Sequence, residues 1–195
     1  RERISNGRDI RCKPLALDCC ATPPSPDRRL CARTRCKTTW CLMTKPRIFI
    51  GDARDVAAIM PVMERAFDPV YGEAWTAAQC LSLLAAPATG LFLAAQNEKI
   101  VGFALSRWIV DEEELLMIGV DPEFQRQGIA HNLLSHVIDR ARSANRVRIF
   151  LEVRSNNPAL SFYQNFGFEY CGTRRSYYRG INGDRFDATT MALNL

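Results

Sequence analysis

The sequence predicts an α+β fold, in which a mixed and mostly antiparallel sheet of about six or seven strands carries helices on both faces. Strand-like segments dominate the first part of residues 43–195, and helical segments interrupt the strands later. One apolar run, over 115–120, stops at Asp121-Pro122, and proline disfavours helical geometry in the residue before it. After Ala130, by contrast, apolar residues recur at the 3.6-residue spacing of a helix.

The first part contains two predicted helices among four predicted strands. Asp52 and Thr76 are suited to N-cap the helices, which then end near Phe67 and Leu84. A long irregular stretch, over 68–75, separates the two helices. The strands cover residues 47–50, 90–96, 100–110 and 115–120, with a turn over 111–114 before the last strand.

The turn over 121–130 is predicted to bind an anion. Its end reads Gln-Arg-Gln-Gly-Ile-Ala over 125–130, which places small residues at a helix start. Free backbone amides and the helix dipole both attract negative charge there, which suits a pyrophosphate. A glycine that only lets the helix pack closely on the strand is the alternative interpretation. The segment has neither the Gly-Lys-Ser/Thr end of a P-loop nor a GxGxxG dinucleotide motif.

The later part continues with a helix over 128–143 and a strand over 147–153. Asn157 before Pro158 suits the start of a short helix, which ends near Phe166. Two final strands, over 168–178 and 185–193, complete the sheet.

Glu152 and Tyr163 are the candidate catalytic residues. Glu152 interrupts an otherwise apolar strand, where partial desolvation suits a carboxylate to act as a general base. The alternative is a carboxylate at the sheet edge that pairs with Arg148 or Arg154. Tyr163 lies on the short helix, where its phenol can act as an acid or its ring can simply pack in the core. Spacing alone leaves both alternatives open.

Residues 1–42 differ from the rest in charge and in cysteine content. They carry ten Lys and Arg against four acidic residues, a net charge of +6, whereas the remainder is at −1. They also hold six of the eight cysteines. A zinc site would require closely paired cysteines such as CxxC. A nucleic-acid-binding arm would require more aromatic residues than Trp40, and a disulfide framework conflicts with an intracellular enzyme.

The first methionine of the chain is Met43, directly before the first predicted strand. We therefore expect residues 1–42 to be a disordered Cys/Arg-rich leader or an upstream translation extension, and residues 43–195 to form the functional domain. No apolar run approaches the roughly 20 residues that span a bilayer. No signal peptide pattern opens the sequence. A cytoplasmic protein is therefore expected.

Four motifs, in order along the chain, resemble those of the GNAT acetyltransferases. They are Gln-Arg-Gln-Gly-Ile-Ala over 125–130, Leu-Glu-Val-Arg over 151–154, Asn156-x-x-Ala-x-x-Phe-Tyr163, and Gly167-Phe168. The tail Arg174-Arg-Ser-Tyr-Tyr178, followed by Gly-Asp-Arg-x-Asp over 183–187, is more narrowly similar to the RimI-type N-terminal alanine acetyltransferases of a small-subunit ribosomal protein. The resemblance covers nearly all of residues 43–195.

This resemblance implies acetyl-coenzyme A as the donor and a protein N-terminal α-amine as the acceptor. Glu152 would accept the amine proton, and Tyr163 would protonate the leaving thiolate. Tyr177 and Tyr178 would hold the acceptor peptide. The implied cofactor-binding residues are Ile118, Val120, Arg126, Gln127, Gly128, Ile129, Ala130 and Asn156.

We further expect a monomer or weak dimer that uses no metal and contacts neither nucleic acid nor membrane. A GNAT enzyme that acts on lysine or on a small-molecule amine is an alternative, as is a non-catalytic acyl-coenzyme A-binding module. Direct transfer in a ternary complex needs no covalent intermediate. Cys80 and Cys171 are therefore expected in the core, and His131 and His136 at the surface.

Overall fold

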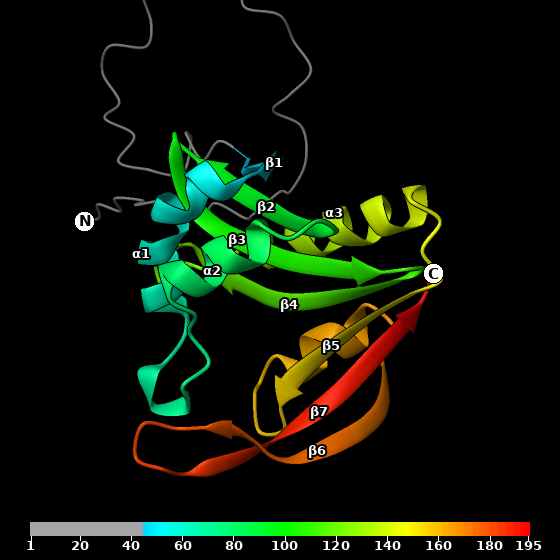
Figure 1. Ribbon diagram of the computed structural model, residues 1–195. Helices are drawn as coiled ribbons and strands as arrows, with labels where there is room; N and C mark the ends of the chain where they lie inside the picture. Colours follow the sequence, from blue (N-terminus) through cyan, green and yellow to red (C-terminus); the bar gives the residue numbers. More distant parts are fainter. Residues whose placement is uncertain (1–44) are drawn as a thin grey trace, which may run out of the picture. The chain divides into compact units, whose positions relative to one another are not determined.

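The computed structural model describes residues 45–195, and the expectation for residues 1–42 lies outside this range. The described residues form one seven-stranded sheet in the order β1-β2-β3-β4-β5-β7-β6 (Figure 1). Only β4 and β5 run parallel, and every other neighbouring pair is antiparallel. The predicted α+β class and strand number are therefore confirmed.

The elements follow the predicted order closely. The strands are β1 (Arg47–Gly51), β2 (Thr89–Gln96), β3 (Lys99–Ile109), β4 (Glu112–Val120), β5 (Arg148–Arg154), β6 (Glu169–Arg179) and β7 (Arg185–Asn194). The helices are α1 (Val56–Ala66), α2 (Ala77–Leu84), α3 (Ile129–Ser143) and α4 (Leu160–Asn165), with short 3-10 turns η1 (Ala53–Asp55), η2 (Pro69–Tyr71) and η3 (Pro122–Phe124). None of the helices in 45–195 has the length and apolarity needed to cross a bilayer.

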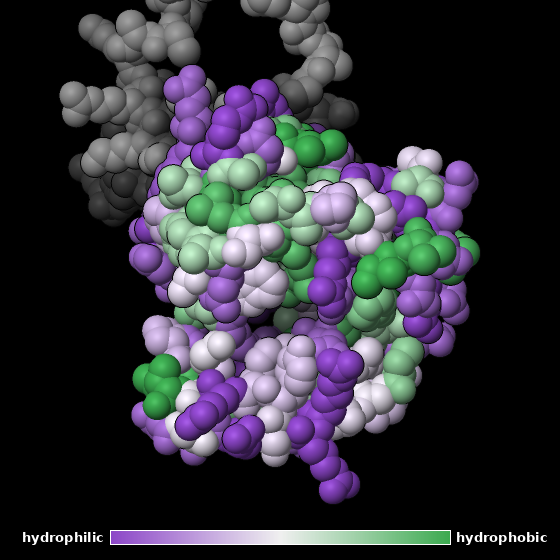
Figure 2. Space-filling view, viewed as in Figure 1, coloured by the Kyte–Doolittle hydropathy of each residue, from purple (hydrophilic) through white to green (hydrophobic). Residues whose placement is uncertain are grey.

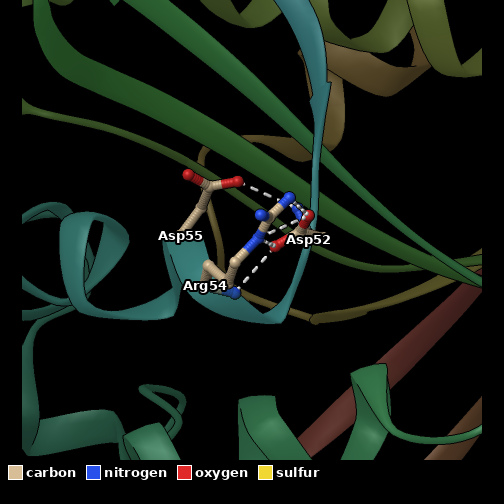
Figure 3. A network of polar contacts seen from close by, with 3 residues as sticks. All are labelled: Asp52, Arg54 and Asp55. Atoms are coloured by element: carbon tan, nitrogen blue, oxygen red, sulfur yellow. Dashed lines mark hydrogen bonds and ion pairs between the residues drawn. The ribbon is translucent and has the colours of Figure 1, made fainter.

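Both predicted N-caps of the first part are present, although the first one starts a different element. Asp52 caps η1, and α1 follows only from Val56. The Asp52 carboxylate accepts from the Arg54 amide at 2.8 Å and pairs with the Arg54 guanidinium at 2.6 Å, while Asp55 accepts from the Asp52 amide (Figure 3). The Arg54 hydrogen bonds lower the pKa of Asp52 to about 2. Thr76 caps α2 through a reciprocal capping box with Gln79, as predicted.

Two hydrophobic clusters lie on opposite faces of the sheet. One joins the sheet to α3 and α4, and the other joins it to α1 and α2. Neighbouring residues of β2 alternate between them: Phe92 belongs to the first cluster, and Leu91 and Leu93 belong to the second. Fully burying each such side chain contributes roughly 1.5–3 kcal/mol to stability. The predicted placement of helices on both faces is therefore confirmed.

Some local predictions are wrong. The expected turn over 111–114 is mostly strand, because β4 already begins at Glu112. Glu113 is fully buried there, and it accepts a hydrogen bond from Ser106 at 2.7 Å and pairs with Arg140 at 3.5 Å. Both partners contact the same carboxylate oxygen, Oε1, inside the structure rather than in a turn.

Other differences concern single side chains. Asn157 accepts from the amide of Ala159 at 2.9 Å, but the α4 helix begins only at Leu160. Cys80 is buried as expected, whereas Cys171 is exposed because it lies on the edge strand β6. His131 is exposed, and His136 is half-buried with its ring 5.7 Å from that of Phe92.

Candidate active site

The site begins where the two parallel strands separate. β4 and β5 pair over only four positions, from Glu112 opposite Arg148 to Leu115 opposite Leu151. Beyond these positions the strands diverge (Figure 1), and the same face of the space-filling view is hollowed between them (Figure 2). The far half of β4 and residues from Glu152 onward therefore line a gap in the sheet.

Backbone groups of β4 point into this gap. Gly102 of β3 lies opposite Val120, and the amide of Asp121 donates to the carbonyl oxygen of Val101 at 2.9 Å. In an antiparallel ladder this arrangement marks Gly102–Val120 as a pair without mutual hydrogen bonds, and Ala104–Ile118 as the next such pair. The N–H and C=O groups of Ile118 and Val120 therefore face away from β3. The Val120 carbonyl meanwhile accepts from the Gln125 side-chain amide at 3.2 Å.

The turn after β4 presents backbone amides at the mouth of the gap. α3 has Gly128 at its N-cap with no side-chain cap, so the first-turn amides have no acceptor within the helix. Gly128 has φ +77°, which glycine adopts without strain, and the space where a Cβ would lie is empty to 4 Å. Arg126, at φ 62°, and Gln127 are exposed beside it. This arrangement fits a diphosphate group.

A buried carboxylate anchors this turn. Asp121 is fully buried, caps η3, and pairs with Arg65 of α1 at 2.7 Å and with Lys99 of β3 at 3.5 Å. Burial alone would raise the pKa of Asp121, but the Arg65 hydrogen bond and the two positive charges lower it overall. The start of the turn is therefore fixed to both α1 and β3.

Glu152 lies one residue beyond the last position at which β5 pairs with β4. Its side chain is 11% exposed, and its carboxylate pairs with Arg174 of β6 at 2.9 Å. Its backbone carbonyl accepts from the Tyr178 hydroxyl at 3.1 Å. Burial and the nearby Glu152 charge raise the pKa of Tyr177, whose ring lies 5.0 Å from that of Tyr178. The structure thus brings Glu152, Tyr177 and Tyr178 together, and the partner of Glu152 is neither Arg148 nor Arg154.

Tyr163 projects from α4 into the apolar cluster that joins the sheet to α3 and α4. It is 7% exposed, and its ring contacts those of Phe162 and Phe168. Burial, with a smaller effect from the Glu73 charge, raises the pKa of Tyr163 above its usual range. The phenol is therefore un-ionised at neutral pH, as it also is at the usual pKa of tyrosine.

A second carboxylate–arginine pair flanks the same region. Glu73, in the loop between α1 and α2, accepts from Arg154 of β5 at 3.2 Å, and both side chains are largely buried. The Arg154 guanidinium lies 3.4 Å above the centroid of the Tyr71 ring and 5.9 Å from that of Phe186. Burial raises the pKa of Glu73, and the charge of Glu73 in turn adds to the raised pKa of Tyr178.

The loop that carries Glu73 also contacts the β6–β7 hairpin. The rings of Tyr71 and Phe186 meet edge to face at 5.3 Å. Gly72, at φ +63°, lies so near the Arg179 carbonyl that a side chain there would collide with it. The loop and the hairpin thus form a bridge beside the end of β5 (Figure 1).

Asn156 is the predicted cofactor-binding residue that departs most from expectation. Its carboxamide oxygen accepts from the Arg154 guanidinium, so that oxygen is already engaged within the protein. The sequence analysis missed Arg154 and Glu73 as site residues. Arg154 stood inside the motif Leu-Glu-Val-Arg, where a charged residue at a strand end was the available signal. Glu73 lay in an irregular loop that offered none.

A shallow groove of about 230 Å³ leads to Glu152 along β5 and β7. Phe150 and Cys171 lie on its walls, and Arg174 lies at the end that holds Glu152. Helices α1 and α2 pack on β2, β3 and β4. Within residues 45–195 this face of β5 and β7 is therefore left open, and Glu152 is accessible from it.

Comparisons with known proteins agree with this geometry. Residues 56–168 match the family model described as the acetyltransferase (GNAT) family. A ribosomal protein bS18-alanine N-acetyltransferase of Escherichia coli (strain K12) is 41% identical over 103 residues, 52% of this chain and 69% of that protein. The N-alpha-acetyltransferase RimI of Mycobacterium tuberculosis is 32% identical over 160 residues, 80% of this chain and 87% of that protein. The crystal structure of the Escherichia coli ribosomal-protein-S18-alanine N-acetyltransferase superposes with a TM-score of 0.69 at 33% identity, covering 76% of this chain and 93% of that chain.

Proposed function

This chain belongs to the acetyltransferase (GNAT) family and is an acetyl-coenzyme A-dependent N-acetyltransferase, and we propose that its acceptor is the N-terminal alanine of ribosomal protein bS18. The Escherichia coli relative carries that substrate in its name, and the crystal structure of that name shares the fold along 93% of its length. We place the reaction in the cytoplasm, where ribosomal proteins are made. We further propose a monomer or weak dimer that needs neither nucleic acid nor membrane.

The gap between β4 and β5 is the proposed site of the donor. The first-turn amides of α3, together with residues 126–130, would hold the pyrophosphate. The backbone groups of Ile118 and Val120 would hydrogen-bond the pantetheine arm, displacing the Gln125 amide from the Val120 carbonyl. Asn156 would reach the cofactor through its amide nitrogen, because its oxygen binds Arg154. Bound in this way, acetyl-coenzyme A supplies the activated acetyl group.

Glu152 and Tyr163 are the proposed proton acceptor and proton donor. An α-amine has a pKa near 8, so a carboxylate close to it, directly or through a water molecule, suffices to remove the proton. A phenol is protonated at neutral pH, so Tyr163 would be able to deliver a proton to the leaving sulfur. Tyr178 is tied to the Glu152 carbonyl and, with Tyr177, would position the acceptor chain.

The preference of the enzyme for an N-terminal acceptor is assigned to the bridge between the α1–α2 loop and the β6–β7 hairpin. Tyr71 and Phe186 meet across it, and Arg154 lies beneath. A crossing of this kind beside the end of β5 restricts the approach from that side, and the free end of an extended chain passes it more readily than a lysine that projects from a folded surface. This observation supports an N-terminal α-amine over a lysine side chain.

The test is an acceptor assay. Release of free thiol from acetyl-coenzyme A is measured with a peptide of the bS18 N-terminus that begins with a free alanine, with the same peptide blocked at its α-amine, and with simple polyamines. We expect turnover only with the free alanine peptide. Activity that survives the block, or a preference for polyamines, would contradict the proposal.

A further inference from the structure

Two carboxylate–arginine pairs flank the gap, and they differ in how readily the ion pair can break. Glu73 pairs with Arg154, whose side chain is 6% exposed. Arg154 is further fixed by the Tyr71 ring and by Asn156. Glu152 pairs with Arg174, whose side chain is 60% exposed. The first pair is therefore a fixed part of the structure, whereas in the second pair Glu152 can exchange Arg174 for another cation.

The position of Arg174 also favours its movement. β6 is the edge strand of the sheet, and its register with β7 shifts between Arg174 and Tyr178. Arg174 has a second contact within reach, because its guanidinium lies 5.4 Å from the centroid of the Tyr177 ring. An arginine on an irregular edge strand can leave a carboxylate at little cost, since a half-exposed ion pair contributes little.

The acceptor is itself a cation. An α-amine with a pKa near 8 arrives mostly as ammonium at neutral pH, and it needs a carboxylate partner once it leaves water. The Glu152 side chain is only 11% exposed, which leaves little room for two cations on its carboxylate. An arriving ammonium and the Arg174 guanidinium therefore compete for the same place.

We propose that Arg174 occupies, on Glu152, the position that the α-ammonium of the acceptor takes, and that it withdraws when the acceptor binds. This inference rests on the proposed function. Arg174 is thus a specificity-determining residue that acts through Glu152. It screens the carboxylate from small cations that gain no other contacts, whereas a peptide held by Tyr177 and Tyr178 displaces it.

The test measures binding of the alanine peptide to the full 195-residue chain in the presence of coenzyme A, by calorimetry. Arg174→Ala removes the competitor and is expected to tighten peptide binding by about two- to fivefold, which corresponds to the free energy of one partly exposed ion pair. Arg174→Lys keeps a competing cation and should stay near the wild type. The matched control is Arg175→Ala, which removes the same charge from the next residue of β6, on the alternate face.

Two further measurements test whether the tighter binding of Arg174→Ala acts through Glu152. In a Glu152→Gln background, adding Arg174→Ala should leave the peptide affinity unchanged, since the shared carboxylate is gone. Weaker or unchanged binding in Arg174→Ala, or equal tightening in the Glu152→Gln background, would overturn the inference. Alaninamide, which presents the same α-ammonium without the peptide, is titrated in parallel. If Arg174→Ala tightens the binding of alaninamide but not that of the peptide, the result counts against the ribosomal acceptor. If it tightens the binding of neither probe, the result counts against the displaced arginine.

Discussion

Arg154→Ala is expected to destabilise the domain strongly, because it removes one partner of a largely buried ion pair. The Arg154 and Glu73 side chains are 6% and 13% exposed and lie 3.2 Å apart. Breaking a buried pair in this way typically costs about 3–5 kcal/mol. The lower end applies here, because burial already raises the pKa of Glu73 and the carboxyl can protonate once the arginine is gone. A loss of about 3 kcal/mol lowers the melting temperature of a domain this size by about 6–12 °C.

The assay is thermal and urea unfolding of the wild type and of three variants. Glu73→Gln combined with Arg154→Ala should recover part of the loss, since no charge is then left unpaired. Arg54→Ala is the matched control, because its ion pair with Asp52 is exposed, and no measurable change is expected. A melting temperature for Arg154→Ala within about 2 °C of the wild type would refute the reasoning. Acetyl-coenzyme A binding should survive, while the KM for the acceptor rises as the loop is released.

Three further predictions concern single side chains. Tyr163→Phe should lower kcat about 100-fold with an unchanged melting temperature, because only the proton donor is lost; a kcat equal to that of the wild type would exclude Tyr163 as the acid. Gly128→Ala should weaken acetyl-coenzyme A binding about fivefold, because alanine disfavours φ +77° by about 1 kcal/mol and binding has to hold the turn in that conformation. Gly183→Ala, strained in the same way at φ +85°, should leave that affinity unchanged, and an equal effect of both would contradict the assignment. Burial raises the pKa of Glu113. Between the unfolded and folded pKa values the folded chain therefore holds a proton that the unfolded chain has lost, and stability falls as the pH rises through that interval. Glu113→Gln should flatten that slope in urea unfolding measured as the pH is raised from about 5, and an unchanged slope would assign the dependence to another group.

The sequence was most informative where the cause of a structure is local. Thr76 caps α2 because its partner Gln79 is three residues away, and the turn into α3 follows from a proline and a glycine close together. Glu152 was found because one charge interrupts an apolar strand. In each case the residues that determine the structure lie within about one turn of each other.

The sequence was least informative where partners are far apart along the chain. Glu73 and Arg154 are 81 residues apart, and the sequence near either residue does not predict its partner. Glu113 was expected in the turn over 111–114, where four acidic residues follow one another. Its burial depends on Ser106 across the ladder and on Arg140 at the end of α3. The Arg174 partner of Glu152 likewise depends on β7 lying between β5 and β6.

One parallel pair in an otherwise antiparallel sheet accounts for the position of the site. Parallel neighbours require a crossover, and α3 supplies it between β4 and β5. The crossover has to start at the far end of β4, so the uncapped N-terminus of α3 lies beside the gap where the pairing ends. The same divergence exposes the backbone of Ile118 and Val120 on one side and Glu152 on the other. Because β7 then pairs antiparallel with β5, the hairpin that it forms with β6 returns its tyrosines to Glu152. The donor groups and the acceptor groups thus meet at one gap as a consequence of strand order.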